Sequence, residues 1–178
     1  TIGFGHNIDA DPTYNFGNEI TQEQAYQLLA KDLLKVKRDI KTCVKDVDKL
    51  NKNQQEALSE LFFNVGMKKI KDTNLIKNIN DGKLEDAACE FDFIYSGKDA
   101  HHHLCKRRMY DTDKFCSGKY TPKTAEALKN IYNKGIESLE SKSEKSNILW
   151  KGYYWLEKER FINSQKPLLD KAEKNTKK

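Results

Sequence analysis

The chain has 178 residues, of which 37% are hydrophobic, 33% are charged and 10% are aromatic, with a formal net charge of +5. This composition is too apolar and too aromatic for a disordered chain, and no apolar stretch approaches the roughly 20 residues that span a bilayer. No signal peptide is visible, although the sequence opens on Thr1 rather than on methionine. These features favour a globular protein in the cytoplasm that does not contact a membrane.

The order of apolar and polar residues predicts a mostly helical chain. Residues 1–8 alternate apolar with small or polar residues, which predicts a short β-strand, and a loop rich in Asp, Pro, Asn and Gly follows. From residue 21 onward the apolar residues keep helical spacing. The expected helix starts are Thr21, where Gln24 completes a capping box, Asn51, Asp72 or Thr73, Leu84 and His101. The sequence therefore predicts an α+β fold with a small N-terminal β element and a helical lobe.

Residues 121–178 differ in composition from the part before them. They carry the whole net charge and both tryptophans, whereas residues 1–120 hold 19 basic and 19 acidic residues and all the Cys and His. Thr121, followed by proline, predicts another helix start, and a polar break is expected at residues 141–146. We expect a domain of residues 1–120, a helical C-terminal extension of residues 121–178, and fraying from Ala172 to Lys178.

The four cysteines are loosely spaced and include no CxxC pair. They are Cys43, Cys89, Cys105 and Cys116. Three of them fall on or beside the apolar faces of expected helices, where a free thiol behaves as a small hydrophobic group. Reduced, buried thiols are therefore favoured over two disulfides.

A run of three histidines, His101, His102 and His103, raises the question of a metal site. Adjacent residues on a helix splay about 100° apart, so they do not converge as ligands at i and i+4 would. A solvated helix face is predicted instead, without a metal.

The segment Thr1-Ile2-Gly3-Phe4-Gly5-His6 resembles the signature T-[IV]-G-[YFI]-G-H of the phage-type lysozymes, glycoside hydrolase family 24. Further blocks resemble that family in order and spacing up to about Gly118. They are Leu50 to Leu58, Phe63 to Gly66, Thr73 to Ile76, and Leu104 to Arg108 followed by Asp111. The resemblance implies a lysozyme-like fold and no cofactor. It also implies hydrolysis of the β-1,4 bond between N-acetylmuramic acid and N-acetylglucosamine in peptidoglycan.

The resemblance also assigns roles to residues. Family members use a Glu about fifteen residues before the signature Thr as general acid, and an Asp or Cys about six before it. Thr1 matches the signature Thr, so both acidic positions would precede residue 1. Asp9, Asp11 and Glu19 are expected to be solvated turn carboxylates. We therefore expect this chain to be a lysozyme that lacks its N-terminal catalytic segment and, with it, the general acid. By itself the chain is expected to be inactive.

Four residues are candidates for the sugar cleft by this resemblance. Thr1 is the candidate catalytic residue, and Asn64, Arg107 and Arg108 are candidates for substrate binding. Ion pairs of the arginines with Asp111 or Asp113 are the alternative, and both roles are compatible. His6 is expected to be structural and to pair with a carboxylate.

A second interpretation is a non-catalytic structural or adaptor protein that keeps the lysozyme fold within a larger assembly, such as a phage particle or a cytoskeletal filament. The aromatic residues Trp150, Tyr153, Tyr154 and Trp155 lie among basic ones in the extension. Such residues can stack on nucleobases, but interspersed glutamates oppose tracking of a phosphate backbone. Packing of residues 121–178 on residues 1–120, or on a protein partner, is therefore favoured over nucleic acid, and attachment to a protein partner is expected.

Overall fold

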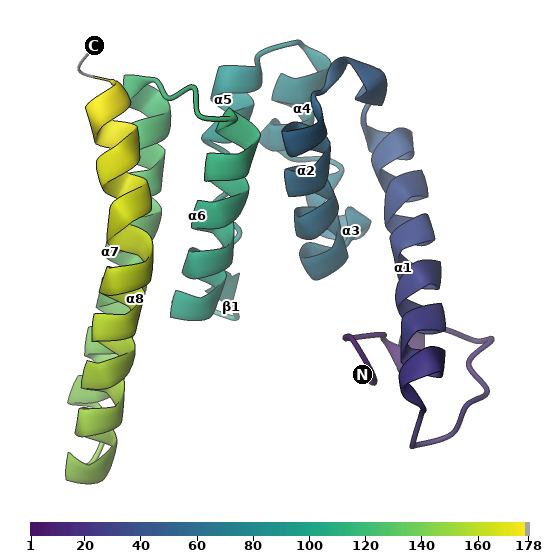
Figure 1. Cartoon of the computed structure of the whole chain (residues 1–178), viewed down its shortest axis with the longest axis horizontal. Coiled ribbons are helices and arrows are strands. Elements are labelled where there is room, and N and C mark those ends of the chain that lie inside the picture. Colours follow the sequence, from purple (N-terminus) through teal and green to yellow (C-terminus); the bar gives the residue numbers. More distant parts are fainter. Residues whose placement is uncertain (177–178) are drawn as a thin grey trace.

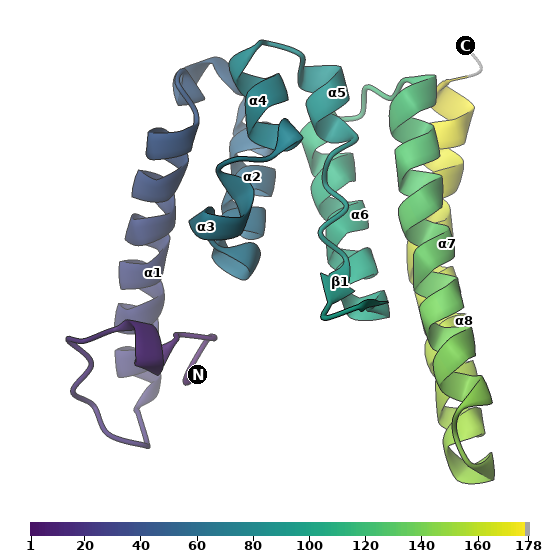
Figure 2. The same cartoon turned by 180° about the vertical axis from the view of Figure 1, so that it is seen from behind.

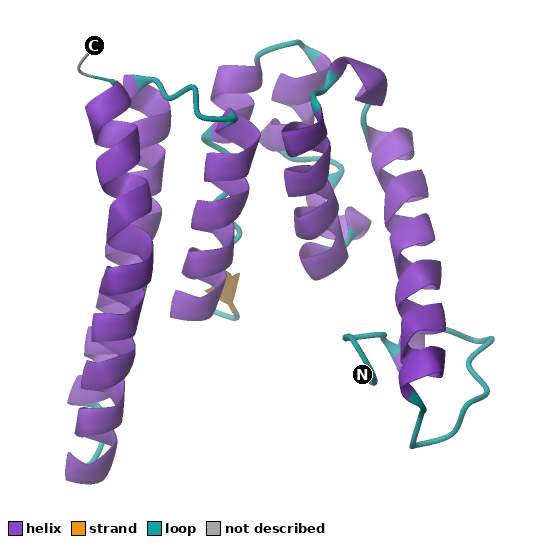
Figure 3. Cartoon of the chain, viewed as in Figure 1, coloured by secondary structure: helices purple, strands orange, loops and turns teal. Residues whose placement is uncertain are grey.

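The computed structural model describes residues 1–176, and Figure 3 shows that helices dominate it. The elements are η1 (Ile8–Ala10), α1 (Gln22–Cys43), η2 (Val47–Lys49), α2 (Lys52–Val65), α3 (Met67–Ile70), α4 (Asn74–Asn80), α5 (Leu84–Ala88), β1 (Tyr95–Ser96), β2 (Asp99–Ala100), α6 (His102–Cys116), α7 (Pro122–Glu144) and α8 (Ile148–Asn175). This architecture confirms the predicted α+β class. Within the described residues, no helix is both long enough and apolar enough to cross a bilayer.

Three long helices begin at reciprocal caps that the local sequence encodes. At the start of α1 the Gln24 amide donates to Thr21 Oγ1 at 3.2 Å, and the Thr21 amide donates to Gln24 Oε1 at 2.8 Å. Asn51 and Gln54 repeat this arrangement at α2, and Thr121 with Thr124 repeats it at α7. Each cap satisfies amide groups that a helix start leaves without partners, so the predicted starts are confirmed.

The long helices stand side by side in a row. Figure 1 shows α1 at one end, the α7–α8 hairpin at the other, and α2 and α6 between them. Seen from behind, in Figure 2, the short helices α3, α4 and α5 cover one side of α2 and α6. A continuous hydrophobic core runs through this row, and Phe115, Leu128 and Phe161 belong to it. The hairpin therefore shares its core with the helices before it.

The β structure differs in place from the sequence expectation. The N-terminal β element is a single antiparallel bridge between Ile2 and His6 rather than an extended strand. The two-stranded sheet lies further on, where Tyr95 pairs with Ala100 and Ser96 with Asp99 around a turn at Gly97. Gly97 has a φ of 69°, which glycine adopts without steric cost. Strands of two residues carry too little alternation to be recognised from sequence.

The predicted fraying from Ala172 onward is wrong for the described residues. Helix α8 continues to Asn175, and Ala172 is fully buried. Packing against the neighbouring helices orders this turn, which composition alone does not indicate. Lys177 and Lys178, which the same expectation included, lie outside the described residues.

The four cysteines are unpaired, but the prediction of buried thiols holds for only two of them, so the four should differ in reactivity. Cys105 and Cys116 are buried, and burial raises their thiol pKa to about 12 and about 11. Cys43 and Cys89 are partly exposed. Because the thiolate is the reactive form, we expect Ellman's reagent to modify Cys43 and Cys89 first and to reach the other two only in denaturant. Equal rates for all four in the folded protein would contradict this assignment.

Candidate functional site

The N-terminal signature folds into a tight turn. The Ile2 amide donates to the His6 carbonyl, and the His6 amide donates back to Ile2, both at 3.0 Å. Gly3 has a φ of 57°, and a Cβ atom there would lie 3.1 Å from the Ile20 side chain and 3.2 Å from Ala25 Cβ. The glycine is therefore required both for its backbone conformation and for close packing on α1.

His6 connects this turn to α1 through side-chain contacts with a carboxylate. Its Nδ1 atom lies 3.0 Å from both carboxylate oxygens of Asp32, and its Nε2 atom lies 3.1 Å from Asp11. Lys31 donates to the same Asp11 oxygen at 2.5 Å. His6 is buried, so it serves the structural role expected of it. The sequence indicated that His6 would pair with a carboxylate but not with which one, since Asp32 lies 26 residues away.

The turn, the middle of α1 and the end of α2 enclose a pocket of about 470 Å³. Figure 1 shows the N-terminal segment lying against the first half of α1. Thr1 and Asn64 both line this pocket, although 63 positions separate them in the sequence. The other lining residues are Gly5, His6, Asn7, Ala10, Asp11, Lys31, Asp32, Lys35, Val36, Arg38, Asp39, Phe62, Phe63, Val65 and Gly66.

A buried ion pair orients the Asn64 side chain through a hydrogen bond. Arg108 is fully buried, and its Nη2 atom donates to Asn64 Oδ1 at 3.2 Å. Its Nε atom lies 3.1 Å from Asp111, which is also buried. The alternative of an ion pair with Asp111 is thus realised at Arg108, which contacts a pocket residue without lining the pocket itself.

The Arg107 side chain pairs with a glutamate of α2 and not with a pocket residue. Its Nη2 atom donates to Glu60 of α2 at 2.9 Å, and both side chains are partly exposed. It does not line the pocket. The structure therefore brings Thr1 and Asn64 together in one pocket and joins Arg108 to Asn64 by a hydrogen bond. It places Arg107 on the outer surface of α6.

The carboxylates that line this pocket are held by basic groups. Lys31, with a smaller contribution from Thr13, holds the pKa of Asp11 well below its usual range. Asp32 is paired with His6, and Asp39 accepts from Lys35 at 2.9 Å. Asp11 is therefore an ion-paired group with a largely covered side chain, rather than the solvated turn carboxylate that was expected. An ionised, paired carboxylate cannot donate the proton that glycoside hydrolysis requires.

A larger hollow of about 800 Å³ lies between α5 and α7. Burial, together with Asp92 and Asp86, raises the pKa of Glu90 on its wall. None of the four candidate cleft residues lines it. We therefore assign the candidate site to the pocket that holds Thr1 and Asn64, despite its smaller volume.

Comparison with known proteins identifies the family of this chain. The phage lysozyme family model matches residues 1–111, which is more than half of the chain. The chain therefore belongs to the phage lysozyme family. No solved structure matches it significantly.

Curated relatives from phages agree with the family assignment. The endolysin of Acyrthosiphon pisum secondary endosymbiont phage 1 is 36% identical over 91 residues, which cover 51% of this chain and 58% of that protein. The endolysin of Bacillus phage B103 is 31% identical over 150 residues, covering 76% of this chain and 53% of that protein. The endolysin of Salmonella phage P22 is 33% identical over 112 residues, which cover 61% of this chain and 74% of that protein. The chain spans a little over half the length of the first two relatives.

Proposed function

We propose that this chain forms one wall of the sugar-binding cleft of a peptidoglycan hydrolase that cleaves the β-1,4 bond between N-acetylmuramic acid and N-acetylglucosamine. The supporting observation is that Thr1 and Asn64 line one pocket. A hydroxyl and a carboxamide can each donate to and accept from sugar hydroxyl and acetamido groups. In this proposal Thr1 positions water or stabilises the developing sugar cation, Asn64 binds substrate, and Arg108 positions Asn64.

Binding to cell-wall material tests the cleft directly. We expect Thr1→Val and Asn64→Leu each to weaken co-sedimentation with purified peptidoglycan about three- to tenfold. Each substitution keeps the size of the side chain but removes its hydrogen-bonding group. Arg107→Met, on the outer surface of α6, is the matched control and should bind as the unsubstituted chain does. Equal binding by all four proteins would contradict the proposed cleft.

Hydrolysis requires a protonated carboxylic acid next to the glycosidic oxygen, and each of Asp11, Asp32 and Asp39 is paired with a basic side chain. We therefore expect residues 1–178 alone to hydrolyse peptidoglycan about 10²–10⁴ times more slowly than a complete hydrolase, the loss typical of a missing general acid. A turbidity assay with P22 endolysin as positive control measures this. Lysis at a comparable rate, abolished by Asp11→Asn, would assign the acid to Asp11 and contradict the expectation.

A second proposal concerns residues 121–178, which we propose as a helical C-terminal extension that attaches to a protein partner. The supporting observation is an exposed aromatic tip at the start of α8. We define this aromatic tip as Ile148, Trp150, Tyr153, Trp155 and Leu156, which are 45–85% exposed. Such apolar clusters on a surface mark interaction sites. The alternative of a non-catalytic adaptor would depend on the same surface, but the relatives are endolysins, which supports the hydrolase.

Site-specific crosslinking tests this attachment. A photo-reactive phenylalanine at position 155 should yield a discrete protein adduct in cells that make the chain, since the proposal covers this side chain. The same probe at Lys129, an exposed position on α7, should yield none. Identical adducts from both positions, or none from position 155, would contradict a partner at the aromatic tip.

A further inference from the structure

Three histidines at the start of α6 lie against α8. The ring centroids of His102 and His103 are 3.9 Å apart, and the His101 ring lies 5.1 and 5.3 Å from them. Glu157 of α8 meets this cluster from the other side. One ligand atom each from His102, His103 and Glu157 lies within 4.8 Å of the other two. The solvated face expected for these histidines is therefore wrong for His102, which is buried, and the His102 and His103 rings converge although the two residues are adjacent on the helix.

His102 is the unusual member of this cluster. It is only 6% exposed, and neither of its ring nitrogens has a hydrogen-bond partner within residues 1–176. A buried polar group without a partner costs about 1–3 kcal/mol, so such groups are rare in folded proteins. Both ring nitrogens of His102 are thus left without a partner among the described residues, which points to a ligand at this place.

We propose that His102, His103 and Glu157 bind one Zn²⁺ ion that fastens α8 to the start of α6. Two imidazoles and a carboxylate match the donors that Zn²⁺ prefers, whereas Ca²⁺ and Mg²⁺ require oxygen ligands. His103 is exposed, so water can occupy the fourth position. The ion would satisfy a nitrogen of His102 and join the two parts of the chain that composition distinguishes.

The geometry requires a small adjustment on binding. Zinc–ligand bonds of about 2.0–2.1 Å in a tetrahedron place ligand atoms roughly 3.3 Å apart, so the side chains must close in from up to 4.8 Å. Rotation of the exposed His103 and the partly buried Glu157 can supply this movement. Two positive groups oppose the ion. Lys142 of α7 lies close enough to lower the pKa of His102, and Arg160 lies 2.6 Å from Glu157. We therefore expect an affinity in the micromolar range.

Zinc titration of the full chain tests the site. Competition with a chromophoric chelator at pH 7.5 should show one Zn²⁺ per chain. Glu157→Gln and His103→Asn should each weaken binding at least about tenfold, since even outer-shell partners of a metal site contribute 10- to 100-fold. His101→Asn is the matched control, because it removes a neighbouring histidine outside the triad and should leave the affinity unchanged.

Thermal unfolding gives a second measurement. Zinc should raise the melting temperature of the unsubstituted chain and of His101→Asn, but not that of Glu157→Gln, because a ligand stabilises only the state that binds it. Circular dichroism without zinc verifies that every variant is folded. Equal zinc affinity in Glu157→Gln, equal weakening by His101→Asn, or no binding at up to about 100 μM zinc would each overturn the proposal.

Discussion

Replacing Gly135 by alanine is expected to destabilise the protein by about 3 kcal/mol or more, at the upper end of the range for overpacked cores. Gly135 lies on α7 where the Phe161 ring of α8 packs against it. A Cβ atom there would lie 2.2 Å from Phe161 Cζ and 2.8 Å from its two Cε atoms, far inside van der Waals contact. Phe161 is buried, so its ring cannot turn away without separating the helices. Urea unfolding followed by circular dichroism measures the loss.

Gly152 provides the matched control. It lies inside α8, and a Cβ atom there would meet no other atom within 4 Å. Because alanine restricts the unfolded chain and favours a helix, Gly152→Ala should stabilise the protein by about 0.4–1 kcal/mol. Changes of the same sign and size in both variants would show that contact with Phe161 does not determine the effect.

Replacing Arg108 by methionine is expected to cost about 3–5 kcal/mol, as for other buried ion pairs that lose one partner. The substitution leaves Asp111 buried without its partner and removes the donor to Asn64. Burial already raises the pKa of Asp111 to about 7 against the pull of Arg108. Urea unfolding measures the stability, and peptidoglycan binding of the folded variant should weaken because Asn64 is no longer oriented.

Two further variants separate this effect from a general loss of charge. Arg107→Met removes the exposed ion pair with Glu60 and should cost less than about 1 kcal/mol. Arg108→Met combined with Asp111→Leu replaces the buried pair by apolar groups and should recover much of the lost stability. If the double variant were as unstable as Arg108→Met, an unpaired Asp111 would not be the cause.

Local signals in the sequence predicted the helix starts and the fold class. Thr21 with Gln24 and the proline after Thr121 act within one turn, so their effect does not depend on the rest of the chain. The pairing of Arg108 with Asp111 is similarly local, because three positions along a helix place two side chains on one face. Family membership then directed attention to Thr1 and Asn64.

Contacts between distant segments could not be predicted in this way. Glu60 pairs with Arg107 across 47 positions, and Glu157 meets His102 across 55. The prediction for the histidines considered only one helix, so it could not include a carboxylate from α8. Burial of Ala172 has the same origin, since the packing of α8 on its neighbours decides it.

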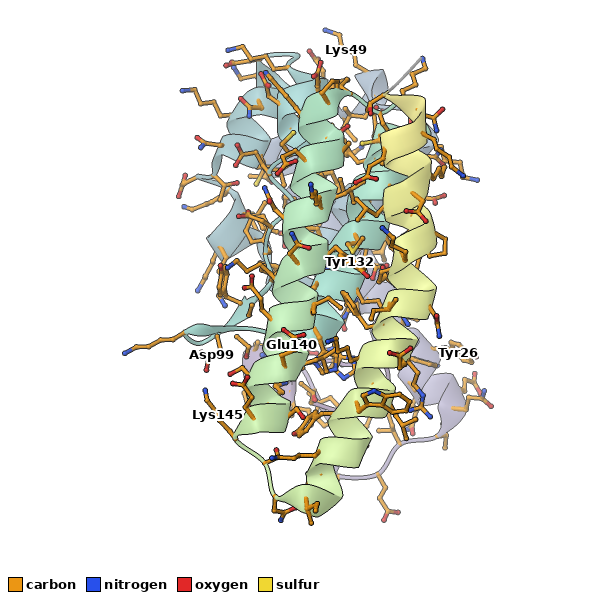
Figure 4. All side chains as sticks on the ribbon, turned by 90° about the vertical axis from the view of Figure 1, so that its left-hand side faces the viewer. Tyr26, Lys49, Asp99, Tyr132, Glu140 and Lys145 are labelled. Carbon is orange, nitrogen blue, oxygen red and sulfur yellow. The ribbon has the colours of Figure 1, made fainter. Side chains whose placement is uncertain are left out.

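The aromatic tip has a spectroscopic consequence. The chain contains two tryptophans, Trp150 and Trp155, and they are 54% and 60% exposed in the folded protein. They lie near the turn between α7 and α8, the end of the hairpin where Figure 4 labels Lys145. Water already reaches more than half of each residue's surface, so unfolding of the core should change their emission little. A blue shift of tryptophan fluorescence would instead report that another molecule has covered the aromatic tip.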